Sequence, residues 1–129
     1  MVLVHYTFMH TLCCWLMGPS GCNISFVVVH DYSCDPNTTM TYLQQVHERY
    51  NNLPIWLTEF SCGDGADGKP TSDQVTFMKS IFPLLDAAPY VERYAWMSAH
   101  DKNGKRGLVQ PGSGGQDELT DLGKLFNSL

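Results

Sequence analysis

This chain of 129 residues has no block of basic residues and no glycine-rich nucleotide motif. Lys and Arg number 8 against 13 Asp and Glu, which gives a formal net charge of −5, so nucleic-acid binding is not expected. The G-x-G-x-x-G and Walker A patterns are missing from the strand-to-helix turns, which argues against a nucleotide-binding fold. The acidic balance is compatible with a neutral substrate.

The spacing of the cysteines matches no metal-ligand pattern. The five positions are Cys13, Cys14, Cys22, Cys34 and Cys62. No C-x-x-C pair occurs, so a zinc site is not expected, and nothing in the sequence indicates another metal or a cofactor. Cys34 and Cys62 each follow the end of a predicted strand. They either form a disulfide or remain free thiols, so the cysteines leave the redox compartment open.

The first 22 residues lack the positive charge of a secretory signal, because Met1 to Met17 is apolar and aromatic without Lys or Arg. The stretch is also too short and too interrupted by His and Thr for a membrane span. It is a degenerate signal or anchor, a strand-and-helix remnant, or non-native sequence at a truncated gene start. The last reading is favoured, because residues 23–129 are far more regular and form the rest of the chain.

From residue 23 onward, β-branched runs alternate with amphipathic helices. Strands are predicted at 24–30, 55–60 and 91–97, helices at 36–50, 71–85 and 119–126, and a Gly-rich polar loop at 101–115. Pro83 is expected to kink or shorten the second helix. This alternation predicts an α/β fold with a parallel sheet. It fits either an open doubly wound sheet or part of a (β/α)₈ barrel.

Strict alternation of side chains along the second strand gives a first prediction for its two faces. Glu59 should share one face with Leu57 and Ile55. Trp56 and Phe60 should then pack against the helices.

The same counting places three side chains, those of His30, Glu59 and Trp96, at one edge of the sheet. His30 and Trp96 stand near the carboxyl ends of the first and third strands, as Glu59 does in the second. The carboxyl ends of parallel barrel strands carry the sites of barrel enzymes. The sequence therefore predicts that His30, Glu59 and Trp96 lie side by side.

Three motifs connect these strands with a known family. They are Val29-His-Asp-Tyr32, Pro54-Ile-Trp-Leu-Thr-Glu-Phe-Ser-Cys62 and Tyr90-Val-Glu-Arg-Tyr-Ala-Trp96. From Ile24 to the C-terminus the chain resembles the Asl1-like glycosyl hydrolase catalytic domain, glycoside hydrolase family 128. The resemblance implies a (β/α)₈ barrel that cleaves β-1,3-glucan with retention, outside the cell or in the cell wall. This chain would hold roughly the last three of eight β/α units.

The resemblance also implies roles for four residues. Glu59 matches the nucleophile, His30 and Tyr32 match a sugar-facing pair, and Trp96 matches an aromatic platform for a sugar ring. Each has a structural alternative. Glu59 could be a carboxylate paired with Arg93, His30 and Trp96 could fill the core, and Tyr32 could be a loop residue.

One part of the family's catalytic apparatus is missing from the sequence. The family's acid/base glutamate belongs to an Asn-Glu motif, and no Asn-Glu pair occurs among Glu48, Glu59, Glu92 and Glu118. The chain alone is therefore expected to be catalytically weak or inactive. The alternative is a non-catalytic glucan-binding remnant. In either case the expected partner is a polysaccharide, and no membrane span is predicted.

Overall fold

The computed structural model describes residues 24–63, 71–101 and 105–129. The predictions for residues 1–22 lie outside the described residues. The elements, in chain order, are β1 (Val27–Asp31), α2 (Pro36–Arg49), β2 (Ile55–Phe60), α3 (Thr71–Ala87), β3 (Val91–Trp96), β4 (Val109–Pro111), β5 (Asp117–Leu119) and α4 (Asp121–Phe126).

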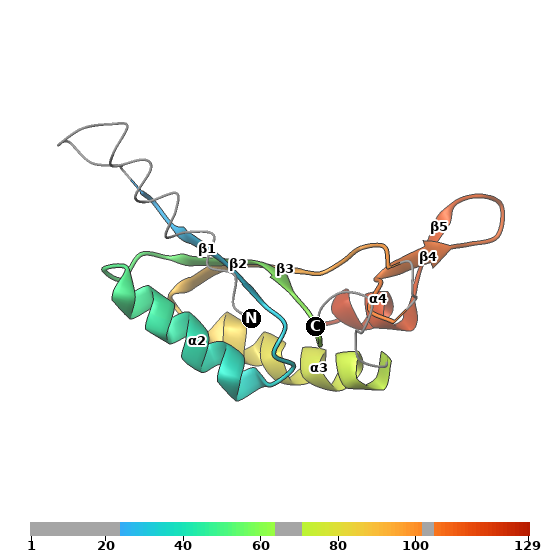
Figure 1. The fold of residues 1–129 in the computed structure, drawn as a ribbon. Coiled ribbons are helices and arrows are strands. Elements are labelled where there is room, and N and C mark those ends of the chain that lie inside the picture. The colour runs from blue at the N-terminus through green and yellow to red at the C-terminus, as the bar shows by residue number, and fades with distance from the viewer. Residues whose placement is uncertain (1–23, 64–70, 102–104) are drawn as a thin grey trace.

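The first three strands form a parallel sheet in the order β1-β2-β3. The crossover helices α2 and α3 lie together against one face of this sheet (Figure 1). The predicted α/β class and parallel sheet are confirmed. A doubly wound sheet carries helices on both faces, whereas α2 and α3 cover the same face.

Local sequence signals explain where α2 begins and ends. The Asp35 side chain accepts a hydrogen bond of 2.7 Å from the Thr38 amide, and Pro36 occupies the first turn, as is typical of a helix start. Asn51 and Asn52 adopt φ angles of 55° and 59° just past the helix, and Asn tolerates that conformation better than most residues. None of the helices in the described ranges is long and apolar enough to cross a membrane.

The helix α3 continues through Pro83 to Ala87, so of the two expected effects of Pro83, a kink or a shorter helix, the shortening does not occur. Phe82 and Leu85 flank the proline and are buried against the sheet. Their packing outweighs the backbone hydrogen bond that proline cannot donate.

The predicted loop at 101–115 is also corrected in part, because β4 lies within it and pairs antiparallel with β5. Gly114 and Gly115, with φ angles of 84° and 77°, lie between the two strands, in a conformation that glycine adopts without strain. Leu119 therefore belongs to a strand and not to the last helix, which starts after its cap, Thr120.

A single apolar core lies between the sheet and the two helices. Its fully buried members include Leu43 from α2, Leu57 and Phe60 from β2, and Ile81 and Leu85 from α3. Burial of this face, at about 25 cal/mol per Å² of apolar surface, is what holds the helices on the sheet.

A disulfide joins Cys34 and Cys62, so the sequence-level choice between disulfide and free thiols is decided for the disulfide. The bond links the segment that follows β1 with the segment that follows β2. It closes a loop with a sequence separation of 28.

We expect the Cys34→Ser/Cys62→Ser double variant to lose about 3.5 kcal/mol of unfolding free energy, since the disulfide restricts the unfolded chain over that loop. Denaturant unfolding measures the loss, and a reductant serves as the matched control. It should lower the unfolding midpoint of the natural chain and leave the variant unchanged. If the reductant does not change the unfolding midpoint of the natural chain, the prediction is refuted.

Gly123 in α4 approaches the backbone so closely that a Cβ there would overlap the carbonyl oxygen of Leu108. We expect Gly123→Ala to lower the unfolding free energy by about 1–3 kcal/mol, because backbone cannot move aside as a flexible side chain can. Thermal unfolding checks this as a lower midpoint. Lys124→Ala on the exposed side of the same helix is the control, and similar midpoints for both variants would argue against the close contact.

Candidate active site

The strand β2 does not alternate strictly between its two faces. The pairing with β1 joins Val29 to Leu57 and then His30 to Glu59, so Thr58 is an extra residue on β2. Such a bulge inverts the side-chain alternation beyond it. Leu57 and Phe60 consequently both face the helices, while Thr58 and Glu59 are both partly exposed.

Because of this bulge, the side chains of β2 lie on different faces of the sheet from those predicted. Ile55 and Leu57 are fully buried in the core with Phe60, so they do not share a face with Glu59. Trp56, expected in the core, lies on the sheet face away from the helices and stacks on Phe26 with ring centroids 3.8 Å apart. Only the placement of Phe60 against the helices is confirmed for this strand.

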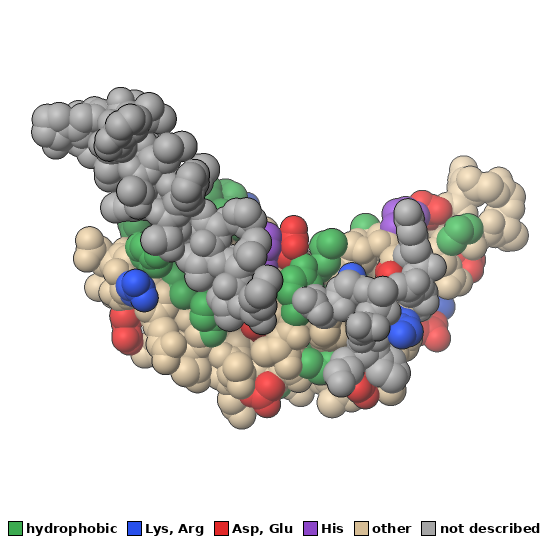
Figure 2. All heavy atoms as spheres, in the orientation of Figure 1, with side chains coloured by type: hydrophobic (Ala, Val, Ile, Leu, Met, Phe, Trp, Pro, Cys, Tyr) green, Lys and Arg blue, Asp and Glu red, His purple; other side chains and the backbone are tan. Residues whose placement is uncertain are grey.

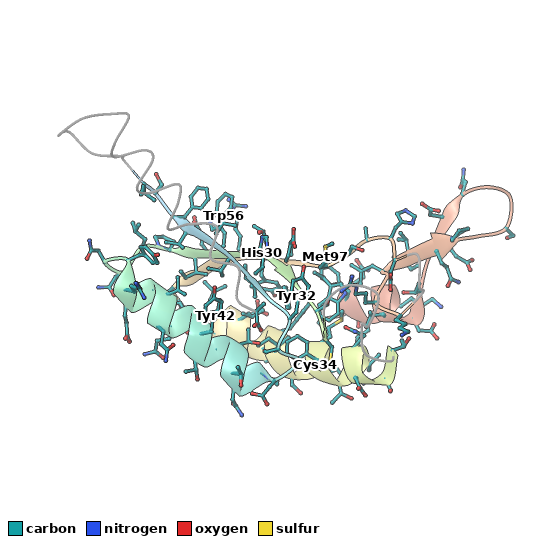
Figure 3. All side chains as sticks on the ribbon, viewed as in Figure 1. His30, Tyr32, Cys34, Tyr42, Trp56 and Met97 are labelled. Carbon is teal, nitrogen blue, oxygen red and sulfur yellow. A yellow bond between two sulfur atoms is a disulfide. The ribbon has the colours of Figure 1, made fainter. Side chains whose placement is uncertain are left out.

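Glu59 lies at the carboxyl end of β2 beside two side chains from β1 and the segment after it. The Tyr32 hydroxyl donates a hydrogen bond of 2.7 Å to Glu59 Oε2. His30 Nδ1 lies 3.4 Å from the same oxygen, and the two side chains are 35% and 40% exposed. Figure 3 shows His30 and Tyr32 close together at this end of the sheet. From the described residues, no hydrogen bond or ion pair reaches Glu59 Oε1.

The sequence-predicted group is therefore brought together in part. His30, Tyr32 and Glu59 meet, and His30 shares the outer face of β1 with the exposed Val28. The alternative in which Glu59 pairs with Arg93 finds no ion pair among the described contacts. The Arg93 guanidinium instead lies 5.0 Å from the centre of the Trp56 ring.

Trp96 is placed differently from the prediction. The pairing with β2 skips Glu92, so Tyr94 and Trp96 turn toward the helices. Trp96 is 7% exposed and packs edge-on against Phe60 at 5.3 Å between ring centroids. Its indole N–H donates to the Arg106 carbonyl oxygen at 2.9 Å. Trp96 is therefore a core residue beneath the site rather than a neighbour of His30 and Glu59.

A buried polar cluster fixes the turn that carries Tyr32. Asp31 is 8% exposed, and its Oδ2 accepts hydrogen bonds from the hydroxyls of Ser33 and Thr39. Burial, together with the negative charge of Asp31, raises the pKa of the nearby Tyr42 phenol, so that group stays neutral. These contacts tie the end of β1 to α2.

The segment after Glu59 is held just as firmly. Ser33 and Cys62 form an isolated antiparallel bridge, and the Gly63 amide donates to the Tyr32 carbonyl oxygen at 3.2 Å. The fully buried Gln74 side chain accepts from the Cys62 amide at 2.9 Å and donates to its carbonyl oxygen at 2.7 Å.

Arg106 adds a third support from the loop after β3. Its Nη1 donates to Ser61 Oγ at 3.3 Å and to the Gly63 carbonyl oxygen at 3.1 Å. Sequence reasoning missed Asp31, Gln74 and Arg106 as supports. For Asp31 and Gln74 the available signal was a polar residue at an otherwise apolar, core-facing position, since buried polar groups are normally hydrogen-bonded. Arg106 lies in a polar loop, where no such signal exists.

The other three glutamates are engaged elsewhere. Glu48 accepts from Gln44 at 2.9 Å, Glu92 from the Trp56 indole at 2.7 Å and Glu118 from Gln110 at 2.9 Å. None of them is hydrogen-bonded to His30, Tyr32 or Glu59, which together form the Glu59 group. In the described part of the chain, no three His, Cys, Asp or Glu side chains are grouped as a metal site would need.

The family model "Glycosyl hydrolase catalytic core" matches residues 6–126. Alkali-sensitive linkage protein 1 of Schizosaccharomyces pombe is 33% identical over 115 residues, which is 84% of this chain and 21% of that protein.

Solved structures of glycoside hydrolases also match the chain. A GH128 subgroup I endo-β-1,3-glucanase of Amycolatopsis mediterranei, in complex with laminarihexaose, matches with a TM-score of 0.66 and 26% identity over 82% of this chain and 45% of that one. A GH128 subgroup III curdlan-specific exo-β-1,3-glucanase of Blastomyces gilchristii, in complex with glucose, has a TM-score of 0.59 and 31% identity over 84% and 42%.

The chain spans less than half of these solved proteins and about a fifth of the curated relative. Within that span, the family match, the curated relative and the solved structures all point to the same family. The chain therefore belongs to the glycosyl hydrolase catalytic core family, and its solved relatives are GH128 β-1,3-glucanases.

Proposed function

We propose that the chain supplies the nucleophile-bearing part of a retaining β-1,3-glucan hydrolase, with Glu59 as the nucleophile. The observation that carries this proposal is the contact of one carboxylate oxygen with Tyr32 and His30 at the carboxyl end of β2. The strands follow one another in the sheet in chain order, and α2 and α3 lie on the same face. This arrangement supports our proposal that the segment from β1 to β3 forms part of a (β/α)₈ barrel.

The two carboxylate oxygens of Glu59 can have separate roles in this reaction. Tyr32 holds Oε2, which leaves Oε1 to attack the anomeric carbon of a glucosyl unit. That attack forms an ester bond to the enzyme while the glycosidic C–O bond breaks, and an acid delivers a proton to the departing oxygen. Water then attacks the same carbon, gives up its proton to the conjugate base and releases the sugar with Glu59 regenerated.

We propose that His30 contributes at this site as a contact for sugar hydroxyls in addition to its contact with Glu59. Its ring is 35% exposed, so it can reach both partners. The Glu59 group lies at the surface, where Figure 2 shows a histidine and an acid beside apolar side chains in the middle of the upper face. An uncharged glucan fits such a surface, since no charge has to be neutralised.

The other three glutamates accept hydrogen bonds from Gln44, Trp56 and Gln110 and none is bonded to His30, Tyr32 or Glu59, so we propose none of them as the acid that protonates the departing sugar. We therefore propose that the chain alone cleaves natural glucan weakly, and faster when the leaving group needs no proton. The same observation favours a second candidate, a non-catalytic glucan-binding domain. We also propose action outside the cell or in the cell wall, where the Cys34–Cys62 disulfide would persist.

The nucleophile is tested with a laminaribioside that carries fluorine at the second carbon and a dinitrophenyl leaving group, because such a reagent traps the glycosyl-enzyme without an acid. We expect the trapped sugar on Glu59, measured by intact mass and peptide mapping. Glu59→Gln should slow labelling by on the order of 1,000-fold or more.

Glu92→Gln is the matched control, since this carboxylate is bound by Trp56, and it should label like the natural chain. Binding of laminarihexaose without any labelling would support the glucan-binding candidate instead. Loss of both binding and labelling would overturn both candidates.

A second prediction concerns the Tyr32 hydroxyl. Tyr32→Phe removes a hydrogen bond to an ionisable group, which is typically worth about 1.5–3 kcal/mol, so labelling of Glu59 should slow by about 10- to 100-fold. Tyr94→Phe removes a bond of the same 2.7 Å length to Asp86, at a tyrosine whose pKa burial raises to about 12. That control should leave the labelling rate unchanged, and equal rates for both variants would remove Tyr32 from the mechanism.

A further inference from the structure

The residue that follows β3 takes the position expected for Trp96. Phe60 pairs with Trp96, and both rings lie on the helix side. The next residue, Met97, continues the ladder, because its amide donates to the Phe60 carbonyl oxygen at 2.9 Å. Since side chains alternate along an extended strand, Met97 turns to the face on which Glu59 lies.

The surroundings of Met97 agree with this orientation. Met78 is fully buried and Met40 packs against the core from α2, whereas Met97 is half-buried and is not part of that packing. In Figure 3 the Met97 side chain projects from the same side of the sheet as His30. Met97 is therefore an apolar side chain at the rim of the Glu59 group rather than a core residue.

We propose that Met97 packs against the apolar C–H face of the glucosyl unit that Glu59 attacks, and so positions that sugar. This inference rests on the proposed function and names a substrate contact within it. Neighbouring strands lie about 4.8 Å apart, so side chains from β2 and from the end of β3 reach opposite sides of a single sugar ring. A thioether is apolar, polarisable and flexible, so it follows the ring as the ring distorts during the reaction.

The inference is tested by NMR on the full chain with its methionine methyl groups labelled with 13C. Laminarihexaose should shift the Met97 methyl signal and leave the signals of Met40 and Met78 in place. The Met97 signal is assigned by its disappearance in Met97→Leu. Laminarihexaose binding that leaves the Met97 signal unmoved would overturn this inference and not the proposed function. An absence of any glucan binding would overturn both.

Variants give a second readout. Met97→Ala should weaken laminarihexaose binding by about 5- to 10-fold, because the apolar contact is lost. Met97→Leu keeps a similar apolar volume and should stay within about threefold of the natural chain. Both variants should keep the natural unfolding midpoint, since Met97 lies outside the core. An alanine variant that binds as tightly as the natural chain would contradict the proposal.

Discussion

The structure depends on one constraint, the burial of Leu57 and Phe60 on the same face of β2. Both side chains are fully buried among the helices, although their spacing of three residues cannot place them on one face of a regular strand. The extra residue Thr58 resolves this conflict. As a result, Glu59 leaves the core, reaches the rim of the sheet and meets Tyr32 and His30. The chemistry of the site is thus a consequence of how the core is packed.

Much of this arrangement was predictable, and the errors in assigning strand residues to a face of the sheet share a cause. The helix start at Asp35, the three strands and the meeting of His30 with Glu59 follow from local patterns that the structure keeps. The faces of Trp56 and Trp96 were wrong because counting by twos assumes a regular strand, and each bulge reverses the count. The position of a bulge depends on packing across the whole core, and the sequences of these strands contain no local signal that predicts it.

The short strands β4 and β5 show a different limit. Glycines and polar residues predict a loop, and the residues between the two strands match that prediction. The pairing itself depends on contacts distant in sequence. His100 forms a bridge with Val109 and lies 3.0 Å from Asp117 across the hairpin, and the Thr120 hydroxyl donates to the Gly107 carbonyl oxygen at 2.7 Å. Such contacts form strands in a segment whose own sequence predicts a loop.

The disulfide gives the site a property of its own. Cys34 comes two residues after Tyr32, and Cys62 comes three residues after Glu59. The donor and the acceptor of the central hydrogen bond are therefore joined through a short covalent path that does not depend on the fold. If either end of the domain opened locally, Tyr32 and Glu59 would stay at high effective concentration and could re-form their contact without a long-range search. The site is in this sense protected against fluctuations of the sheet that carries it.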